Sequence, residues 1–252
     1  MDGPAQIDAC REDLSFKFES SFDISSGVFS PATSDSPQAI FAPLHYEPRY
    51  AYPLLVWLHG PGNDHQQLLR IMPLVSLRNY LAVAPQGILT KPQEEYRWDQ
   101  TTSHIDLAQQ RIFDCIETVS RKYNFSRRKI FLAGFDFGGT MALRVAMNSP
   151  KRFAGVISLG GAFPMGRKPF GNLNDARHLP IFLAAGRKSK SYSEAHVCSD
   201  LRLLHSAGIQ VTLRQYPCGQ EIAPHMLQDM DRWIIEQITA PAQSLAETDE
   251  YK

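Results

Sequence analysis

The stretch that decides the fold is KIFLAGFDFGGTMALRVAM, residues 129–147. Residues 130–133 form a short apolar run, which is typical of a strand buried on both faces. Three glycines follow and permit close backbone approach, after which the apolar residues recur at helical spacing until Asn148-Ser149-Pro150. The stretch therefore predicts a buried strand, a tight turn and a helix in succession, with Asp136 in the turn.

The rest of the chain alternates between the two kinds of element. This alternation predicts an α/β fold with a mainly parallel sheet and helices on both faces. Residues 38–46 return as an extended segment, and we expect an antiparallel edge at the N-terminal side of the sheet. The other predicted strands are 52–58, 80–84, 153–159, 180–185 and 209–216, and the predicted helices are 66–78, a long helix capped by Ser103, 194–205 and 226–238.

Composition restricts the possible partners. The 252 residues contain 26 Lys plus Arg and 26 Asp plus Glu, so the chain carries no net charge and nucleic acid is not an expected partner. The first residues lack the pattern of a signal peptide and no long apolar run follows, so we expect a soluble, cytoplasmic protein without a membrane span. The four cysteines are scattered without a C-x-x-C pair, and neither a metal nor a cofactor is predicted.

The chain divides into three predicted parts. Residues 1–37 form an N-terminal segment with an edge strand, because Leu14, Phe16 and Phe18 alternate with polar residues. Residues 38–239 form the α/β domain. Residues 240–252 form a flexible acidic tail.

Four landmarks resemble the phospholipase/carboxylesterase branch of the α/β-hydrolases, which includes acyl-protein thioesterases. Residues 58–64, LHGPGND, are similar to the L-H-G-x-G-D turn of that family, and residues 134–139, GFDFGG, to its G-F-S-Q-G-G nucleophile elbow. Residues 186–189, GRKS, occupy the place of its acid loop. Pro224-His225, followed by Trp233, resembles the segment that carries its histidine. The resemblance implies an α/β-hydrolase fold without a cap domain.

The resemblance also implies roles for individual residues. At most of these positions the residue differs from the one that the family has. Asp136 stands at the nucleophile position, Ser189 at the acid position, and His225 is the retained histidine of a degenerate triad. Pro61 stands where the family uses a backbone N–H to bind the oxyanion, and proline has none. The resemblance places His59, Gly60 and Gly62 in the same turn, and Phe137 and Trp98 at the pocket.

Three functional hypotheses remain open at this point. The chain is a non-catalytic protein that binds a small acyl or ester-like ligand or another protein, with Asp136 and His225 as an ion pair. Alternatively, it keeps a residual carboxylesterase activity. A third hypothesis makes Asp136 a nucleophile, as in epoxide hydrolases and haloalkane dehalogenases. Those enzymes need a helical cap, and residues 164–178 are too few to form one.

Overall fold

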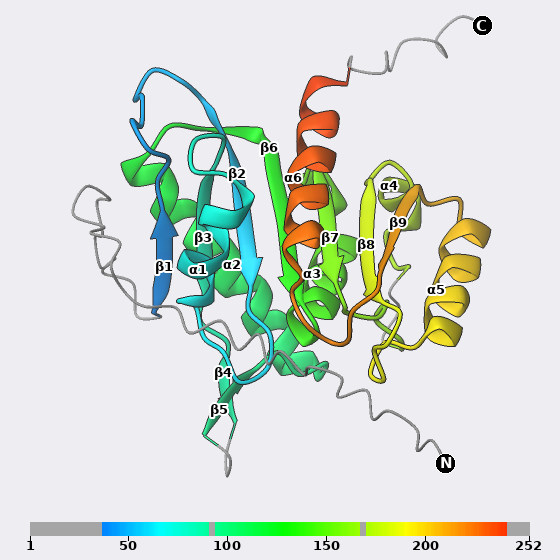
Figure 1. Cartoon of the computed structure of the whole chain (residues 1–252). Helices are drawn as coiled ribbons and strands as arrows, with labels where there is room; N and C mark the ends of the chain where they lie inside the picture. Colours follow the sequence, from blue (N-terminus) through cyan, green and yellow to red (C-terminus); the bar gives the residue numbers. More distant parts are fainter. Residues whose placement is uncertain (1–36, 91–93, 167–169, 241–252) are drawn as a thin grey trace, which may run out of the picture.

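A seven-stranded sheet forms the centre of the computed structural model, which describes residues 37–90, 94–166 and 170–240 (Figure 1). The strand order is β1-β3-β2-β6-β7-β8-β9. β1 runs antiparallel to β3, and all other neighbours in this sheet are parallel, so the predicted sheet and its antiparallel edge are confirmed. The predicted strand around Phe16 lies outside the described residues. The strands are Gln38–Phe41 (β1), Tyr52–Leu58 (β2), Leu81–Pro85 (β3), Phe125–Phe135 (β6), Gly155–Leu159 (β7), Ile181–Gly186 (β8) and Val211–Tyr216 (β9).

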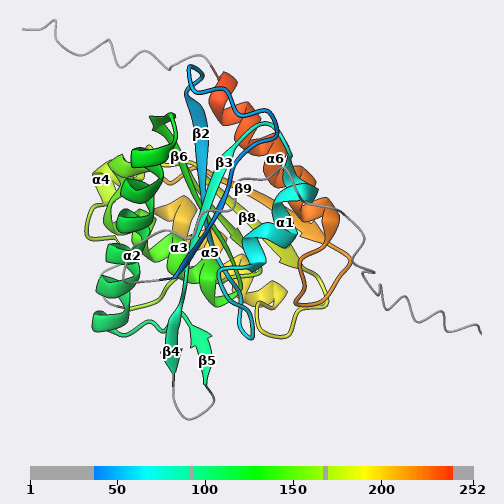
Figure 2. The same ribbon diagram turned by 90° about the vertical axis from the view of Figure 1, so that its left-hand side faces the viewer.

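Helices cover both faces of the sheet, as predicted (Figure 2). α1 and α6 pack against one face, and α2 to α5 pack against the other. The helices are Gln67–Val75 (α1), Thr102–Lys122 (α2), Phe137–Asn148 (α3), Leu173–Ala176 (α4), Glu194–Ser206 (α5) and Pro224–Thr239 (α6), with a 3₁₀ turn at Pro150–Arg152.

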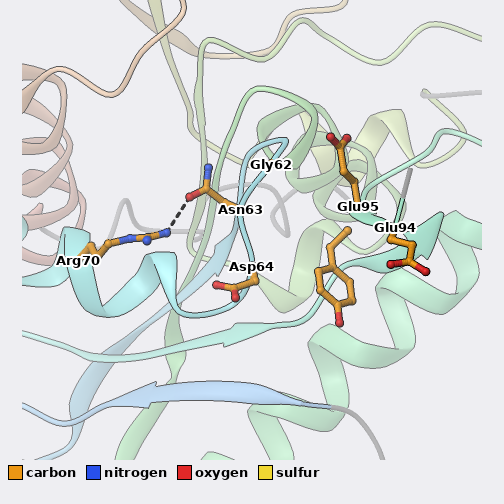
Figure 3. A pocket seen from close by; sticks show the side chains of 7 residues that line it. Gly62, Asn63, Asp64, Arg70, Glu94 and Glu95 are labelled. Carbon is orange, nitrogen blue, oxygen red and sulfur yellow. Dashed lines mark hydrogen bonds between the residues drawn. The ribbon is translucent and has the colours of Figure 1, made fainter. Parts of the chain in front are cut away.

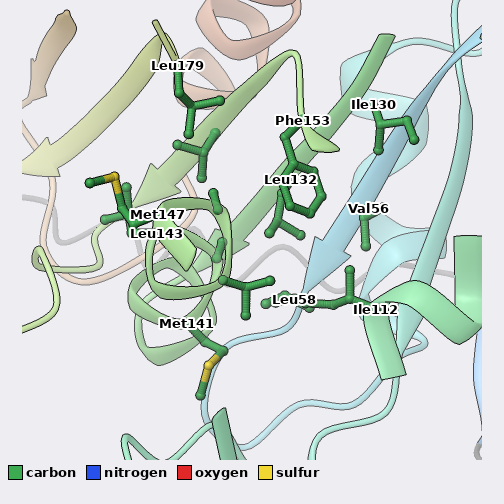
Figure 4. Packing of buried hydrophobic residues seen from close by; sticks show 14 of the residues in the cluster. Val56, Leu58, Ile112, Ile130, Leu132, Met141, Leu143, Met147, Phe153 and Leu179 are labelled. Atoms are coloured by element: carbon green, nitrogen blue, oxygen red, sulfur yellow. The ribbon is translucent and has the colours of Figure 1, made fainter. Parts of the chain in front are cut away.

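Alternation along β2 explains why the sheet holds two cores. All seven residues of β2 are buried. Val56 and Leu58 point toward α2 and α3, where they belong to a cluster with Leu132 and Leu143 (Figure 4). Leu55 and Trp57 point to the opposite face, toward α1 and α6. Successive side chains of a strand alternate between faces, so a strand covered on both sides reads as a continuous apolar run.

The predicted start of α2 and the predicted end of α1 are wrong. α2 begins after Thr101, whose side chain accepts the His104 N–H at 3.3 Å, so Thr101 and not Ser103 is the N-cap. α1 ends at Val75, three residues earlier than predicted. There Ser76 is extended, and the Leu77 carbonyl accepts the Leu44 N–H at 2.8 Å instead of continuing the helix.

The segment after β3 contains a short hairpin. β4 (Ile88–Thr90) pairs antiparallel with β5 (Glu95–Arg97) and projects below the main sheet in Figure 1. The loops after β2, β6, β8 and β9 leave the sheet at the same end, because these strands are parallel. Residues far apart in the sequence can therefore meet at this end.

Candidate functional site

Asp136 occupies the sharp turn between β6 and α3. Its backbone has φ 52° and ψ −121°, a combination that costs a non-glycine residue about 1–3 kcal/mol. Two hydrogen bonds hold the turn: the Asp136 N–H donates to the Leu159 carbonyl at 2.9 Å, and the Asp136 carbonyl accepts the Thr140 N–H at 3.0 Å. The side chain is thereby held at the N-terminus of α3, at the carboxyl end of the sheet.

Close packing fixes the elbow against the neighbouring strand. A Cβ on Gly138 would overlap the backbone oxygen of Leu58, at the end of β2. A Cβ on Gly134 would overlap the backbone of Gly138. Only glycine fits at these two positions, so the sequence pattern around Asp136 is a packing requirement.

The carboxyl of Asp136 is half-buried, and burial raises its pKa. Hydrogen bonds from the Gln220 side chain and the Phe137 backbone N–H lower the pKa, but their effect is smaller than that of burial. The Phe137 N–H therefore lies beside the Asp136 carboxyl. Phe137 also has an exposed ring, with 54% of the residue accessible.

Gln220 links Asp136 to Ser189. Its Oε1 accepts a hydrogen bond from the Ser189 hydroxyl at 2.5 Å, and its Nε2 donates to the Gly160 carbonyl at 2.8 Å. Ser189 is buried in the loop after β8, and its Oγ also accepts the Tyr192 N–H at 3.0 Å. Ser189 is thus bonded directly to Gln220, and Gln220 lies close enough to Asp136 to lower the pKa of its carboxyl.

The structure does not bring His225 into this group. His225 is exposed at the start of α6, and no ion pair joins it to Asp136 within the described ranges. The sequence prediction missed Gln220 because it searched for an imidazole. The available signal was position: Gln220 follows the end of β9 by four residues, in the loop that reaches the site, whereas His225 already belongs to a helix.

His59 supports the turn that follows β2. It is fully buried, and its Nε2 accepts the Gly87 N–H at 3.0 Å, so its Nδ1 carries the proton shared with the Gly60 carbonyl at 2.9 Å. Burial lowers the pKa of His59 and favours this neutral form. Trp98 is buried beside it and donates from Nε1 to the His59 carbonyl at 3.0 Å.

The same turn offers few free N–H groups. The Gly60 N–H donates to Oε1 of Gln67 at 3.2 Å, and Pro61 has no N–H. Gly62 adopts a positive φ of 66° at the exposed tip of the turn. In this turn one N–H is therefore occupied and another is missing.

A pocket of about 240 Å³ lies beside this turn rather than over Asp136 (Figure 3). It lies between the turn, the first part of α1 and the β4–β5 hairpin, and Arg70 reaches across one side to Oδ1 of Asn63 at 2.7 Å. The lining residues are Gly62, Asn63, Asp64, Arg70, Glu94, Glu95 and Tyr96.

The described residues hold neither a metal-binding cluster nor a membrane-spanning helix. No group of three or more His, Cys, Asp or Glu side chains in these ranges has the arrangement of a metal site. None of the described helices is both long and apolar enough to span a membrane.

Comparison with known proteins identifies relatives of this architecture. Residues 47–238 match the Phospholipase/Carboxylesterase family. A carboxylesterase from Mesorhizobium loti superimposes with a TM-score of 0.68 at 18% identity, covering 82% of this chain and 98% of that one. A Bacillus cereus carboxylesterase gives 0.65 at 16% identity, over 81% and 96%, and Zea mays acyl-protein thioesterase 2 gives 0.63 at 16%, over 81% and 99%. At these identities the structural likeness shows the α/β-hydrolase fold alone.

Proposed function

Because this chain belongs to the phospholipase/carboxylesterase family, we propose that it is a non-catalytic member, with Asp136, Gln220 and Ser189 in the nucleophile, base and acid positions. The observation that carries this proposal is the contact of Gln220 with both other residues. In a serine hydrolase, the residue between the nucleophile and the acid is a histidine, which takes a proton from one and is oriented by the other.

Gln220 cannot perform the work of a general base. A carboxamide does not titrate in the range where enzymes operate, so it neither accepts the proton of a nucleophile nor returns it to a leaving group. Its oxygen already accepts the hydroxyl of Ser189, and its nitrogen donates to Gly160. The amide therefore holds the loops together in place of transferring a proton.

Nucleophilic attack by Asp136 is the less favoured alternative. Burial favours the neutral carboxylic acid, which is a poorer nucleophile than the carboxylate. Release of an ester intermediate would also need a base to activate water, and Gln220 supplies none. Between β7 and β8 the described residues hold only the four-residue helix α4, which is too small for a cap domain.

Stabilisation of an oxyanion is weakened as well. The Asp136 carboxyl lies beside the Phe137 N–H and would compete with an oxyanion for it, and Pro61 supplies no N–H at the opposite turn. Removing one donor from an oxyanion hole typically lowers turnover about 100- to 1,000-fold. The family relationship suggests a small acyl or ester-like compound as the ligand, which Phe137 would contact at the mouth of the site.

The test is a search for turnover in the unmodified chain. We expect no labelling by a fluorophosphonate probe that reacts with active serines, and no hydrolysis of short p-nitrophenyl esters above the rate in buffer. Small epoxides should leave the mass of the peptide that contains Asp136 unchanged.

Substitutions separate true activity from a contaminating esterase. Ester hydrolysis that disappears in Gln220→Ala or His225→Ala would contradict the proposal, since it would tie catalysis to this site. A covalent adduct on Asp136 after treatment with an epoxide would instead support the aspartate-nucleophile alternative.

A further inference from the structure

Three segments form one surface at the end of the molecule opposite the candidate site. We call residues 44–50, 74–79 and 121–129 the amino-end surface, because they lie at the amino ends of the parallel strands, at the top of Figures 1 and 2. The Leu44 N–H donates to the Leu77 carbonyl at 2.8 Å, and the Asn124 side chain donates to the Pro48 carbonyl at 3.1 Å. These two hydrogen bonds join the three segments directly.

The amino-end surface is strongly basic although the whole chain has no net charge. Its segments contain seven basic residues and one acidic residue, Glu47. Arg127 pairs with Glu117 at 2.9 Å, and in the described ranges no ion pair involves the other six basic residues. All are exposed except Lys129, which is half-buried: Arg49, Arg78, Arg121, Lys122, Arg127, Arg128 and Lys129.

Some of these basic residues lie in an irregular stretch of β6. Tyr52 pairs with Phe125, but Leu54 already pairs with Ile130. Residues 126–129 therefore outnumber their partners on β2 and leave the regular ladder. This bulge lies at the amino end of the sheet, where Arg128 is exposed and Lys129 is half-buried.

Aliphatic side chains accompany the charges. Leu44, Leu74 and Leu77 are 40%, 53% and 42% exposed, and Tyr50 is 54% exposed. Single exposed leucines are ordinary, but here they share one end of the molecule with six unpaired cations. Basic residues that attract anionic headgroups, together with leucine and tyrosine at the interface, are the composition of a surface that lies on a membrane.

We propose that the amino-end surface binds the anionic phospholipids of a membrane surface. The cations contact the headgroups, and the leucines enter the boundary between headgroups and acyl chains. Nucleic acid is the less suitable partner, since binding to phosphates and bases gives no use to exposed aliphatic side chains. This orientation would turn the candidate site away from the bilayer.

Vesicle sedimentation tests the proposal with the full chain. We expect binding to vesicles of phosphatidylcholine with phosphatidylserine, weakened by salt, and none to phosphatidylcholine alone. Arg128→Glu with Lys129→Glu should weaken binding at least about tenfold. The matched control is Arg202→Glu with Arg214→Glu, which reverses two exposed charges elsewhere and should leave binding unchanged.

A second pair of substitutions tests the apolar contribution. Leu74→Ser with Leu77→Ser keeps the charges and should also weaken vesicle binding, with an unchanged circular dichroism spectrum as the check on folding. Three results would overturn the proposal: no binding to anionic vesicles, equal losses in the Arg202/Arg214 control, or binding to duplex DNA as tight as to vesicles and insensitive to the leucine substitutions.

Discussion

At Asp136, two electrostatic effects oppose one another. The N-terminus of α3 and the Phe137 N–H favour a carboxylate, whereas burial favours the neutral acid. Burial is the larger effect, so the pKa is raised. The ionised side chain is therefore less stable in the folded protein than in the unfolded chain, and a neutral isostere should relieve this cost.

We predict that Asp136→Asn stabilises the protein at pH 7. The melting temperature should rise by about 2–4 °C, the shift expected for about 1 kcal/mol in a domain of this size. A raised carboxyl pKa means that the native state holds its proton to higher pH, so wild-type stability falls as pH rises from the ordinary value of about 3.9 toward the folded pKa. The advantage of the variant should accordingly vanish near pH 3.

Thermal melts of both proteins across this pH range provide the check. Asparagine tolerates a positive φ about as well as aspartate, so the backbone strain at position 136 is matched. A difference in melting temperature that stays constant with pH would show that the charge of Asp136 is not the cause of the difference. A variant that melts below the wild type at pH 7 would contradict the proposed cost of the ionised carboxyl.

Sequence reasoning singled out two of the three residues that lie together at this end of the sheet. Asp136 and Ser189 were predicted because they replace residues at recognisable places beside glycines. Gln220 was not, because an amide carries no chemical signal of its own and His225 offers an imidazole five residues later. Only the path of the loop after β9 distinguishes these two candidates.

At the scale of elements, the elbow depends on the contact between α3 and β2. The glycine pattern predicted that a helix and a strand approach each other closely here. It did not predict that the gap is too small for a methyl group. Gly138 leaves no room for a side chain next to Leu58. The first turn of α3, and with it Asp136, is positioned by that contact.

We predict that Gly138→Ala destabilises the protein by about 1–3 kcal/mol, because the added methyl group must push α3 away from β2. Gly219→Ala is the matched control, since a Cβ there meets no atom within 4 Å, and its effect should stay within about 0.5 kcal/mol. Urea unfolding of both variants measures the difference. Equal stability of the two would refute the packing argument for the elbow.

At the scale of the whole molecule, continuous apolar runs made the sheet predictable. β2, β3, β7 and β8 are buried along their full length and were all expected. The β4–β5 hairpin was not predicted as strands, because its residues are partly exposed and charged. The early end of α1 escaped prediction since it depends on a tertiary contact between Leu44 and Leu77.

The two large cores are built from residues between β1 and α6. We therefore predict that a chain of residues 37–240 folds on its own, with a single unfolding transition and a melting temperature within about 4 °C of the full chain, a shift of about 1 kcal/mol at most. Calorimetry of both chains checks this. A lost or split transition would show that the α/β domain extends beyond 38–239.

We propose that Gln220, rather than His225, stands in the position of the catalytic base. Fluorophosphonate labelling of two variants tests it most directly, with melting curves as the check on folding. Asp136→Ser alone restores a hydroxyl while His225 is present, and we predict that it stays unlabelled. Adding Gln220→His should produce labelling at position 136. Labelling of Asp136→Ser alone that disappears on His225→Ala would contradict the account.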